Sequence, residues 1–179
     1  SPKVSKIKSK KLTDPCVYEI SLPDIHYGKM TGETLEELEN HFMECVTDLV
    51  EKASGLEIEK FLLPIGNDGM NSEGMRRTTT KGTPQDMAGS PAQILMGGCK
   101  LAREHIEMLR GIAPIEIVFM NGNHDRYSAL ALAIYLEAVY ENCEDVDVSV
   151  SPKVRQYVTW GNNLLGFTHG DFVKGTDLP

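Results

Sequence analysis

The 179-residue chain lacks several features that would place it in a specialised class. Its four cysteines form no CxxC pair, which argues against a zinc knuckle and a redox motif. No apolar run approaches the ~18 residues that a membrane span needs, and we find no signal peptide, internal repeat or heptad pattern. These absences indicate a folded protein without a membrane partner, and we expect a cytoplasmic location.

An excess of positive charge is also lacking, because the formal net charge is −8. Nucleic-acid-binding proteins usually carry a basic face, although cations bound in a cleft would offset its carboxylates. The five lysines near the start, Lys3, Lys6, Lys8, Lys10 and Lys11, suit either a solvated tail or an arm that contacts a polyanion. We expect residues 1–14 to form this basic tail or arm and residues 15–179 to form one domain.

Apolar periodicity predicts an α/β protein. Strand patterns occur at 16–22, 58–65, 115–120, 146–150, 154–160 and 164–167, and helix patterns at 34–53, 92–109 and 127–142. Thr34 and Glu37 match a capping box, and residues 161–163 match a hairpin turn. Residues 66–91 have no clear period, and a loop of this length is usually functional or disordered. The alternation predicts a central sheet, or a pair of sheets, flanked by helices.

Four short segments with metal-ligand side chains follow the apolar runs. They are Asp24-Ile25-His26, Gly66-Asn67-Asp68, Gly122-Asn123-His124-Asp125 and Thr168-His169-Gly170. Ends of strands are rigid and their loops reach ligands, so these positions are typical of chemistry in α/β proteins.

The first two segments each have a simpler structural explanation. In an extended run Asp24 and His26 would project to one side and share a cation, but a capping Asp beside a surface His would give the same tripeptide. Asp68 would bridge two cations through its two carboxylate oxygens, or it would be an ordinary turn residue.

The third segment is the most specific of the four. Asn123 offers a neutral carbonyl oxygen, His124 would protonate a leaving group, and Asp125 would accept from the other ring nitrogen and fix the tautomer. The alternative is a turn followed by a helix-capping Asp125. Taken alone, a histidine such as His169 would more often have a structural role. Its assignment as a metal ligand depends on its position after the other three segments in the sequence.

In this order the segments resemble the calcineurin-like metallophosphoesterase superfamily, over roughly residues 17–171. The pattern of that family is D-x-H, G-D, G-N-H-[DE], a lone His and G-H-x-H. The block from Leu63 to Asp86 also looks like that of predicted phage-encoded members. The resemblance implies a two-sheet β-sandwich flanked by helices, with two metal ions at the strand ends.

Carried over to this sequence, the resemblance assigns Asp24 and His26 to a first metal ion, and Asn123 and His169 to a second. Asp68 would bridge both ions. His124 would act as general acid, and Asp125 would orient it. Two further residues, Arg126 and Asn67, are candidates for contact with the substrate phosphate.

Two departures from the family pattern affect these assignments. Asn67 intervenes before Asp68, so either residue could occupy the bridging position, and we favour Asp68 because an anion balances two cations better than an amide. No G-H-x-H follows His169, because the chain ends at Pro179. We therefore expect the domain to lack its C-terminal part, and each metal ion to lack one ligand.

The resemblance implies a metal-dependent phosphoester hydrolase. Two cations about 3.5–4 Å apart clamp a phosphoryl group and lower the pKa of a water molecule. The mixed oxygen and nitrogen ligands suit Mn²⁺, our first choice by resemblance, or Fe, Zn²⁺ or Co²⁺. A phosphodiesterase or nuclease acting on DNA is the leading interpretation. A phosphomonoesterase on small molecules or phosphoproteins, and an inactive binding or scaffold protein on the same fold, are the alternatives.

Overall fold

The computed structural model describes residues 14–171. The basic segment predicted for residues 1–14 therefore lies outside the described residues except for Asp14. A mixed α/β fold is observed, as the sequence predicts, with a four-stranded parallel sheet and a two-stranded antiparallel sheet. No helix within residues 14–171 is long and apolar enough to cross a membrane.

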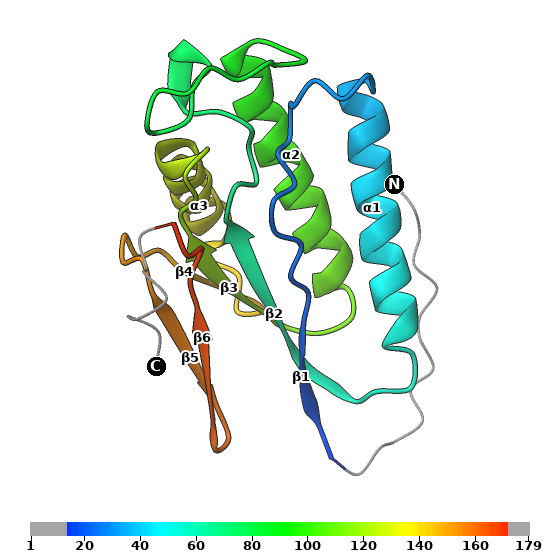
Figure 1. Ribbon diagram of the computed structural model, residues 1–179. Coiled ribbons are helices and arrows are strands. Elements are labelled where there is room, and N and C mark those ends of the chain that lie inside the picture. Colours follow the sequence, from blue (N-terminus) through cyan, green and yellow to red (C-terminus); the bar gives the residue numbers. More distant parts are fainter. Residues whose placement is uncertain (1–13, 172–179) are drawn as a thin grey trace.

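The large sheet has the strand order β1-β2-β3-β4, and all neighbours are parallel. Its elements in chain order are β1 (Cys16–Glu19), α1 (Leu35–Lys52), β2 (Ile58–Gly66), α2 (Pro91–Arg110), β3 (Ile115–Met120), α3 (Arg126–Tyr140) and β4 (Val146–Ser149). Parallel strands added in sequence order, with crossovers of one hand, place every connecting helix on the same face. The three helices accordingly cover one face of this sheet (Figure 1).

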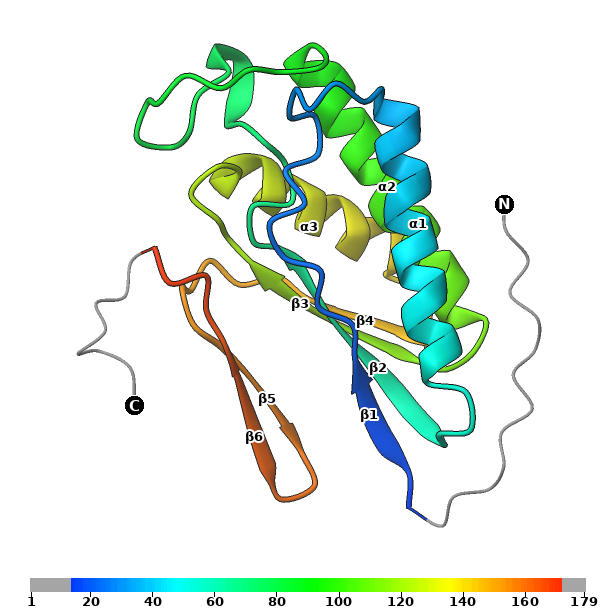
Figure 2. The same cartoon turned by 45° about the vertical axis from the view of Figure 1, so that its right-hand side comes forward.

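The small sheet is the hairpin of β5 (Gln156–Trp160) and β6 (Asn163–Phe167). It lies on the face of the large sheet opposite the helices (Figure 2). Buried Val158 packs there against Leu62 and Val118, whereas Tyr157 and Leu164 on the other face are 60% and 66% exposed. The two-sheet arrangement agrees with the prediction, but helices flank only one side of it within the described residues.

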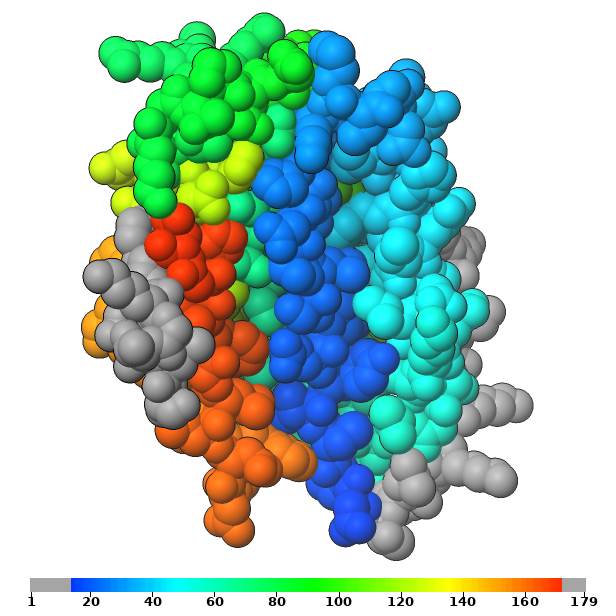
Figure 3. All heavy atoms as spheres, in the orientation of Figure 1, coloured from blue at the N-terminus to red at the C-terminus, as the bar shows by residue number. Residues whose placement is uncertain are grey.

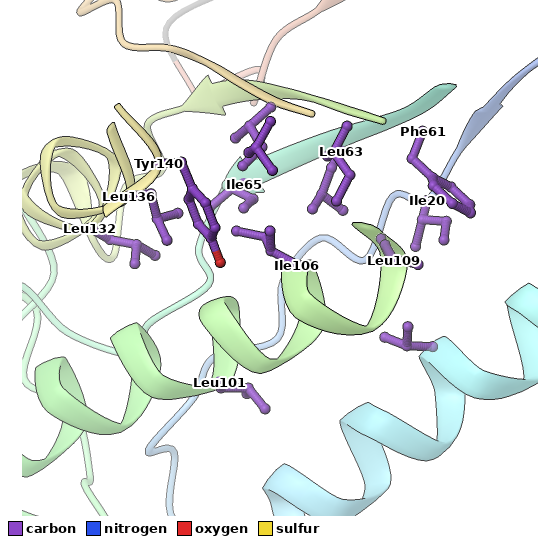
Figure 4. Close-up of a cluster of buried hydrophobic side chains, with 14 of the residues drawn as sticks. Ile20, Phe61, Leu63, Ile65, Leu101, Ile106, Leu109, Leu132, Leu136 and Tyr140 are labelled. Carbon is purple, nitrogen blue, oxygen red and sulfur yellow. The ribbon is translucent and has the colours of Figure 1, made fainter. Parts of the chain in front are cut away.

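The main core fills the space between the large sheet and the helices (Figure 4). Side chains alternate across the sheet, so that Phe61, Leu63 and Ile65 of β2 face the helices while Leu62 faces the hairpin. Both faces of the sheet are thus covered, which explains the continuous apolar runs at residues 61–65 of β2 and 117–120 of β3.

Local sequence signals set most boundaries. The predicted capping box of Thr34 and Glu37 begins α1, and a second box, Ser90 with Gln93, begins α2 with Pro91 in its first turn. The first strand is shorter than predicted and ends at Glu19. The hairpin turn is tighter than predicted, because Trp160 pairs with Asn163 and leaves only two residues between the strands.

The long segment after β2 is ordered by main-chain contacts and not by a helix or strand of its own. It contains one short 3₁₀ turn, Gly74–Arg76. Isolated bridges join Tyr27 to Met70 and Lys29 to Met87, and so attach it to the loop that follows β1. This segment lies beyond the carboxyl ends of the strands, next to the start of α2 (Figure 1).

Candidate metal centre

The predicted donor residues meet at the carboxyl edge of the large sheet. The loops after β1, β2 and β3 emerge at this edge because the three strands are parallel and adjacent. The end of β6 reaches the same place from the hairpin. Figure 3 shows its red residues beside the green segment after β2 and the yellow-green start of α3.

One group of donors comprises His26, Asp68 and His124. Their ligand atoms all lie within 4.8 Å of one another, and the two imidazole rings meet edge to face with centroids 4.5 Å apart. Nδ1 of His26 is buried without a hydrogen-bond partner among the described residues. Burial, followed by the neighbouring His124, lowers the pKa of His26, which favours the neutral ring that a metal ion requires.

A second group surrounds His169. Its Nδ1 lies 2.6 Å from Oδ1 of Asn67, and its Nε2 lies 2.9 Å from Oδ1 of Asn123 and 3.5 Å from Oδ2 of Asp68. A neutral imidazole has one N–H, so it cannot donate to both amide oxygens. A cation on the Nε2 side of the ring would be held by Nε2, Oδ1 of Asn123 and Oδ2 of Asp68, while Nδ1–H donates to Oδ1 of Asn67.

Asp68 belongs to both groups and is only 3% exposed. Its Oδ1 accepts the backbone N–H of His124 at 2.8 Å, and its Oδ2 faces His169. Asn67, the other candidate for the bridging position, reaches only the second group through its contact with His169. The structure thus places the carboxylate, and not the amide, between the two groups.

The position of Asp24 differs from the extended geometry predicted for it. Asp24 and His26 have φ values of 54° and 48°, in the left-handed region, and not the extended conformation that would align their side chains. Oδ1 of Asp24 nevertheless lies 3.8 Å from Nε2 of His26, and its side chain is 61% exposed. Asp24 therefore lies at the edge of the first group and is not one of its three members.

Left-handed backbone is concentrated at this site. Asn67 and Asp68 have φ values of 55° and 60°, and such conformations persist in residues other than glycine only where the surroundings enforce them. Here Asp24 donates its N–H to the carbonyl of Asn67, and His26 donates its N–H to the carbonyl of Asp68. These two bonds lock the loops after β1 and β2 together.

Asp125 has a different partner from the one predicted. Its carboxylate accepts the backbone N–H groups of Asp68 and Met70 at 3.2 and 3.0 Å. The His124 ring is oriented instead by the carbonyl oxygen of Asn71, which lies 3.0 Å from its Nδ1. Burial raises the pKa of the Asp125 carboxyl to about 7. Asp125 thus holds the loop that carries Asp68, a long-range role that the local sequence does not reveal.

Gly122 allows this close packing. A Cβ at that position would lie 1.9 Å from Oδ1 of Asp68 and 2.7 Å from Oδ1 of Asp125. Any side chain would displace one of these carboxylates, so the glycine of the G-N-H-D segment is required by space and not by its own backbone angles.

The start of α3 is capped by a residue that the sequence analysis did not single out. Asp125 occupies the N-cap position but makes no side-chain cap. Glu73, from the segment after β2, instead accepts the N–H groups of Tyr127 and Ser128 at 2.8 and 3.3 Å. Arg126 is the first residue of this helix and is half-buried. No local pattern signals the Glu73 cap, because 54 residues separate the two partners.

Comparisons of the chain with protein-family models, with curated proteins and with solved structures gave no match. The functional assignment therefore rests on the arrangement of the donor residues.

Proposed function

We propose that this protein is a two-metal-dependent phosphoester hydrolase of the metallophosphoesterase type. The main support is the position of Asp68, a buried carboxylate shared by two groups of donors. Asp24 and His26 would hold one divalent cation and Asn123 and His169 the other, with Asp68 in contact with both. Two cations in such a site polarise a phosphoryl group and activate water for attack on phosphorus.

The donor types suit the proposed ions. The two groups combine carboxylate, amide oxygen and imidazole nitrogen and include no thiolate, a set that suits Mn²⁺, Fe, Zn²⁺ or Co²⁺. The shared carboxylate supplies negative charge where two cations would repel each other. Mn²⁺ is the first ion to test.

His124 is proposed as the general acid. The carbonyl of Asn71 accepts a hydrogen bond from Nδ1, so Nδ1 carries a proton. Nε2 is then the atom that would exchange a proton with the substrate. His124 also belongs to the first donor group, so the same ring could serve as a metal ligand. These two roles predict different results for a His124 variant, because only the ligand role requires the ring for metal binding.

A phosphodiester, with DNA as the candidate polymer, is the substrate we propose first. The Thr-rich loop of residues 78–86 borders the site: Thr80 donates its N–H to the carbonyl of Asn123, and Lys81 pairs with Asp171 at 2.8 Å. Lys81, beside the proposed metal site, would be suited to contact a phosphate backbone.

The proposal is tested by hydrolysis of bis-p-nitrophenyl phosphate after chelation and after Mn²⁺ is restored. We expect Mn²⁺-dependent turnover that falls by at least ~100-fold in His124→Ala, while calorimetry still detects two Mn²⁺ ions. The matched control is His41→Ala, since His41 is 63% exposed on α1, where it pairs with Glu33.

Three other outcomes would change the proposal. Loss of a metal ion in His124→Ala would make His124 a ligand and remove its role as acid. Faster hydrolysis of p-nitrophenyl phosphate than of the diester, with no cleavage of single-stranded DNA, would favour a phosphomonoesterase. A folded protein that binds Mn²⁺ but hydrolyses neither ester would overturn the assignment as an enzyme.

A further inference from the structure

A cavity of about 60 Å³ lies on the helix side of the large sheet, behind the metal centre. Its walls come from the loop after β1, from β2 and its following loop, and from α1, α2 and α3. They are largely apolar and include Ile25, Phe42, Ile65, Met70, Leu101 and Leu132. The volume accommodates about four to six water-sized molecules, which is comparable with a small ring compound.

One polar atom in this wall has no partner. His105 of α2 lines the cavity and is 4% exposed, and its Nε2 is buried without a hydrogen bond in the described part of the chain. Its ring packs edge to face against Phe42, with centroids 5.2 Å apart. Burial lowers the pKa of His105 to about 3, so the ring is neutral near pH 7.

The other polar side chains of the wall are already bonded. Tyr27 donates its hydroxyl proton to Glu39 at 2.6 Å, and the carboxylate of Asp125 accepts two backbone N–H groups. A buried water molecule usually has two to four polar partners, and the imidazole nitrogen offers only one. Water is therefore a poor occupant, whereas an apolar molecule with one polar group matches the wall.

We propose that this cavity binds a small, uncharged and mainly apolar molecule whose hydroxyl group pairs with Nε2 of His105. A hydroxyl group both donates and accepts, so it suits either tautomer of the neutral ring. An ionised ligand would lose its hydration among largely apolar walls, where the Asp125 carboxylate is already bonded to two backbone N–H groups. The site is distinct from the metal centre, since Asn67, Asp68 and His169 do not line it.

The probes are phenol and toluene, which have nearly the same shape and differ by a hydroxyl in place of a methyl group. Binding is followed by NMR of methionine methyl groups in the metal-free protein. Met70 lines the cavity, whereas Met96 is 73% exposed on α2 and serves as the internal control. We expect saturable shifts of the Met70 signal alone, with phenol binding about three- to tenfold more tightly than toluene.

The variant His105→Leu should abolish the preference for phenol and keep toluene binding within about twofold, because only the hydrogen bond is lost. His41→Leu is the matched control and should leave both affinities unchanged. Ala102→Met, which fills the cavity from α2, should abolish binding of both probes.

Either of two results would overturn the proposal. One is no saturable shift of Met70 with either probe. The other is a preference for phenol that persists in His105→Leu. If that variant does not fold, equal affinity of phenol and toluene for the unmodified protein overturns the role of His105. None of these measurements depends on metal binding or hydrolysis, so their failure is distinguishable from failure of the proposed function.

Discussion

The two groups of donors at the strand ends are fixed in the fold by different means. His26, Asp68 and His124 come from loops that are hydrogen-bonded to one another: His26 donates its N–H to the carbonyl of Asp68, and Asp68 accepts the N–H of His124. Buried Asp125 adds two bonds to the loop that carries Asp68. This group is held by hydrogen bonds among the loops at the carboxyl edge of the large sheet.

His169 has a weaker attachment. It follows the β5–β6 hairpin, whose contact with the large sheet centres on a small cluster of Leu62, Val118 and Val158. The nearby ion pair of Lys81 and Asp171 involves a lysine side chain that is 66% exposed, and such pairs contribute little. The comparison indicates that the loop group is preformed, whereas the second group depends on how well the hairpin packs.

The largest expected difference between the groups concerns metal stoichiometry. Asp68→Ala removes a ligand of both proposed ions and should lower Mn²⁺ affinity at both by more than about 100-fold, because even residues behind the ligands affect affinity by 10–100-fold. His169→Ala should lose one ion and keep the other. Calorimetric titration with Mn²⁺ measures both variants, and two ions retained in Asp68→Ala would contradict the bridging assignment.

A smaller effect is expected from crowding the loop group without removing a ligand. Gly122→Ala places a Cβ 1.9 Å from Oδ1 of Asp68, and overpacking of this kind costs about 1–3 kcal/mol or more. Urea unfolding of the metal-free protein should show this loss.

The control for this variant is Gly111→Ala at the end of α2. Its Cβ would meet only the carbonyl of Met108, at an ordinary distance of 3.5 Å. Equal stability of Gly122→Ala and Gly111→Ala would show that the loop group is not tightly packed.

The smallest expected effect tests the hairpin. Val158 is 7% exposed, and Val158→Ala should cost about 1–2 kcal/mol through lost apolar burial. If hairpin packing sets the position of His169, the variant should lower the affinity for the second Mn²⁺ ion and leave the affinity for the first unchanged. Thr159→Ala, at an exposed position of the same strand, is the control. An equal loss of affinity for both Mn²⁺ ions in Val158→Ala would show that the two groups do not differ in how they are held.

Much of the fold was predictable because its signals are local. The apolar periods and the Thr34 capping box located the helices and strands, and the parallel sheet then brings the loop residues to one edge. Asn67, Asp68, Asn123 and His169 accordingly meet where the sequence predicts a site.

The parts that escaped prediction depend on partners distant in sequence. Asp125 bonds to a loop 55 residues or more away, and the orienting carbonyl for His124 belongs to Asn71, 53 residues away. The left-handed backbone at Asp24 and His26 is imposed by bonds to the neighbouring loop. No pattern within a short window contains these constraints.

The sequential strand order also has a consequence for synthesis on the ribosome. Each strand of the large sheet pairs with the strand that immediately precedes it in the sequence, so the sheet can assemble as the chain emerges from its N-terminal end. The loops bearing His26, Asp68 and His124 would then be in place before the hairpin is made. His169 arrives last, and a nascent chain would complete its two groups of donors one after the other.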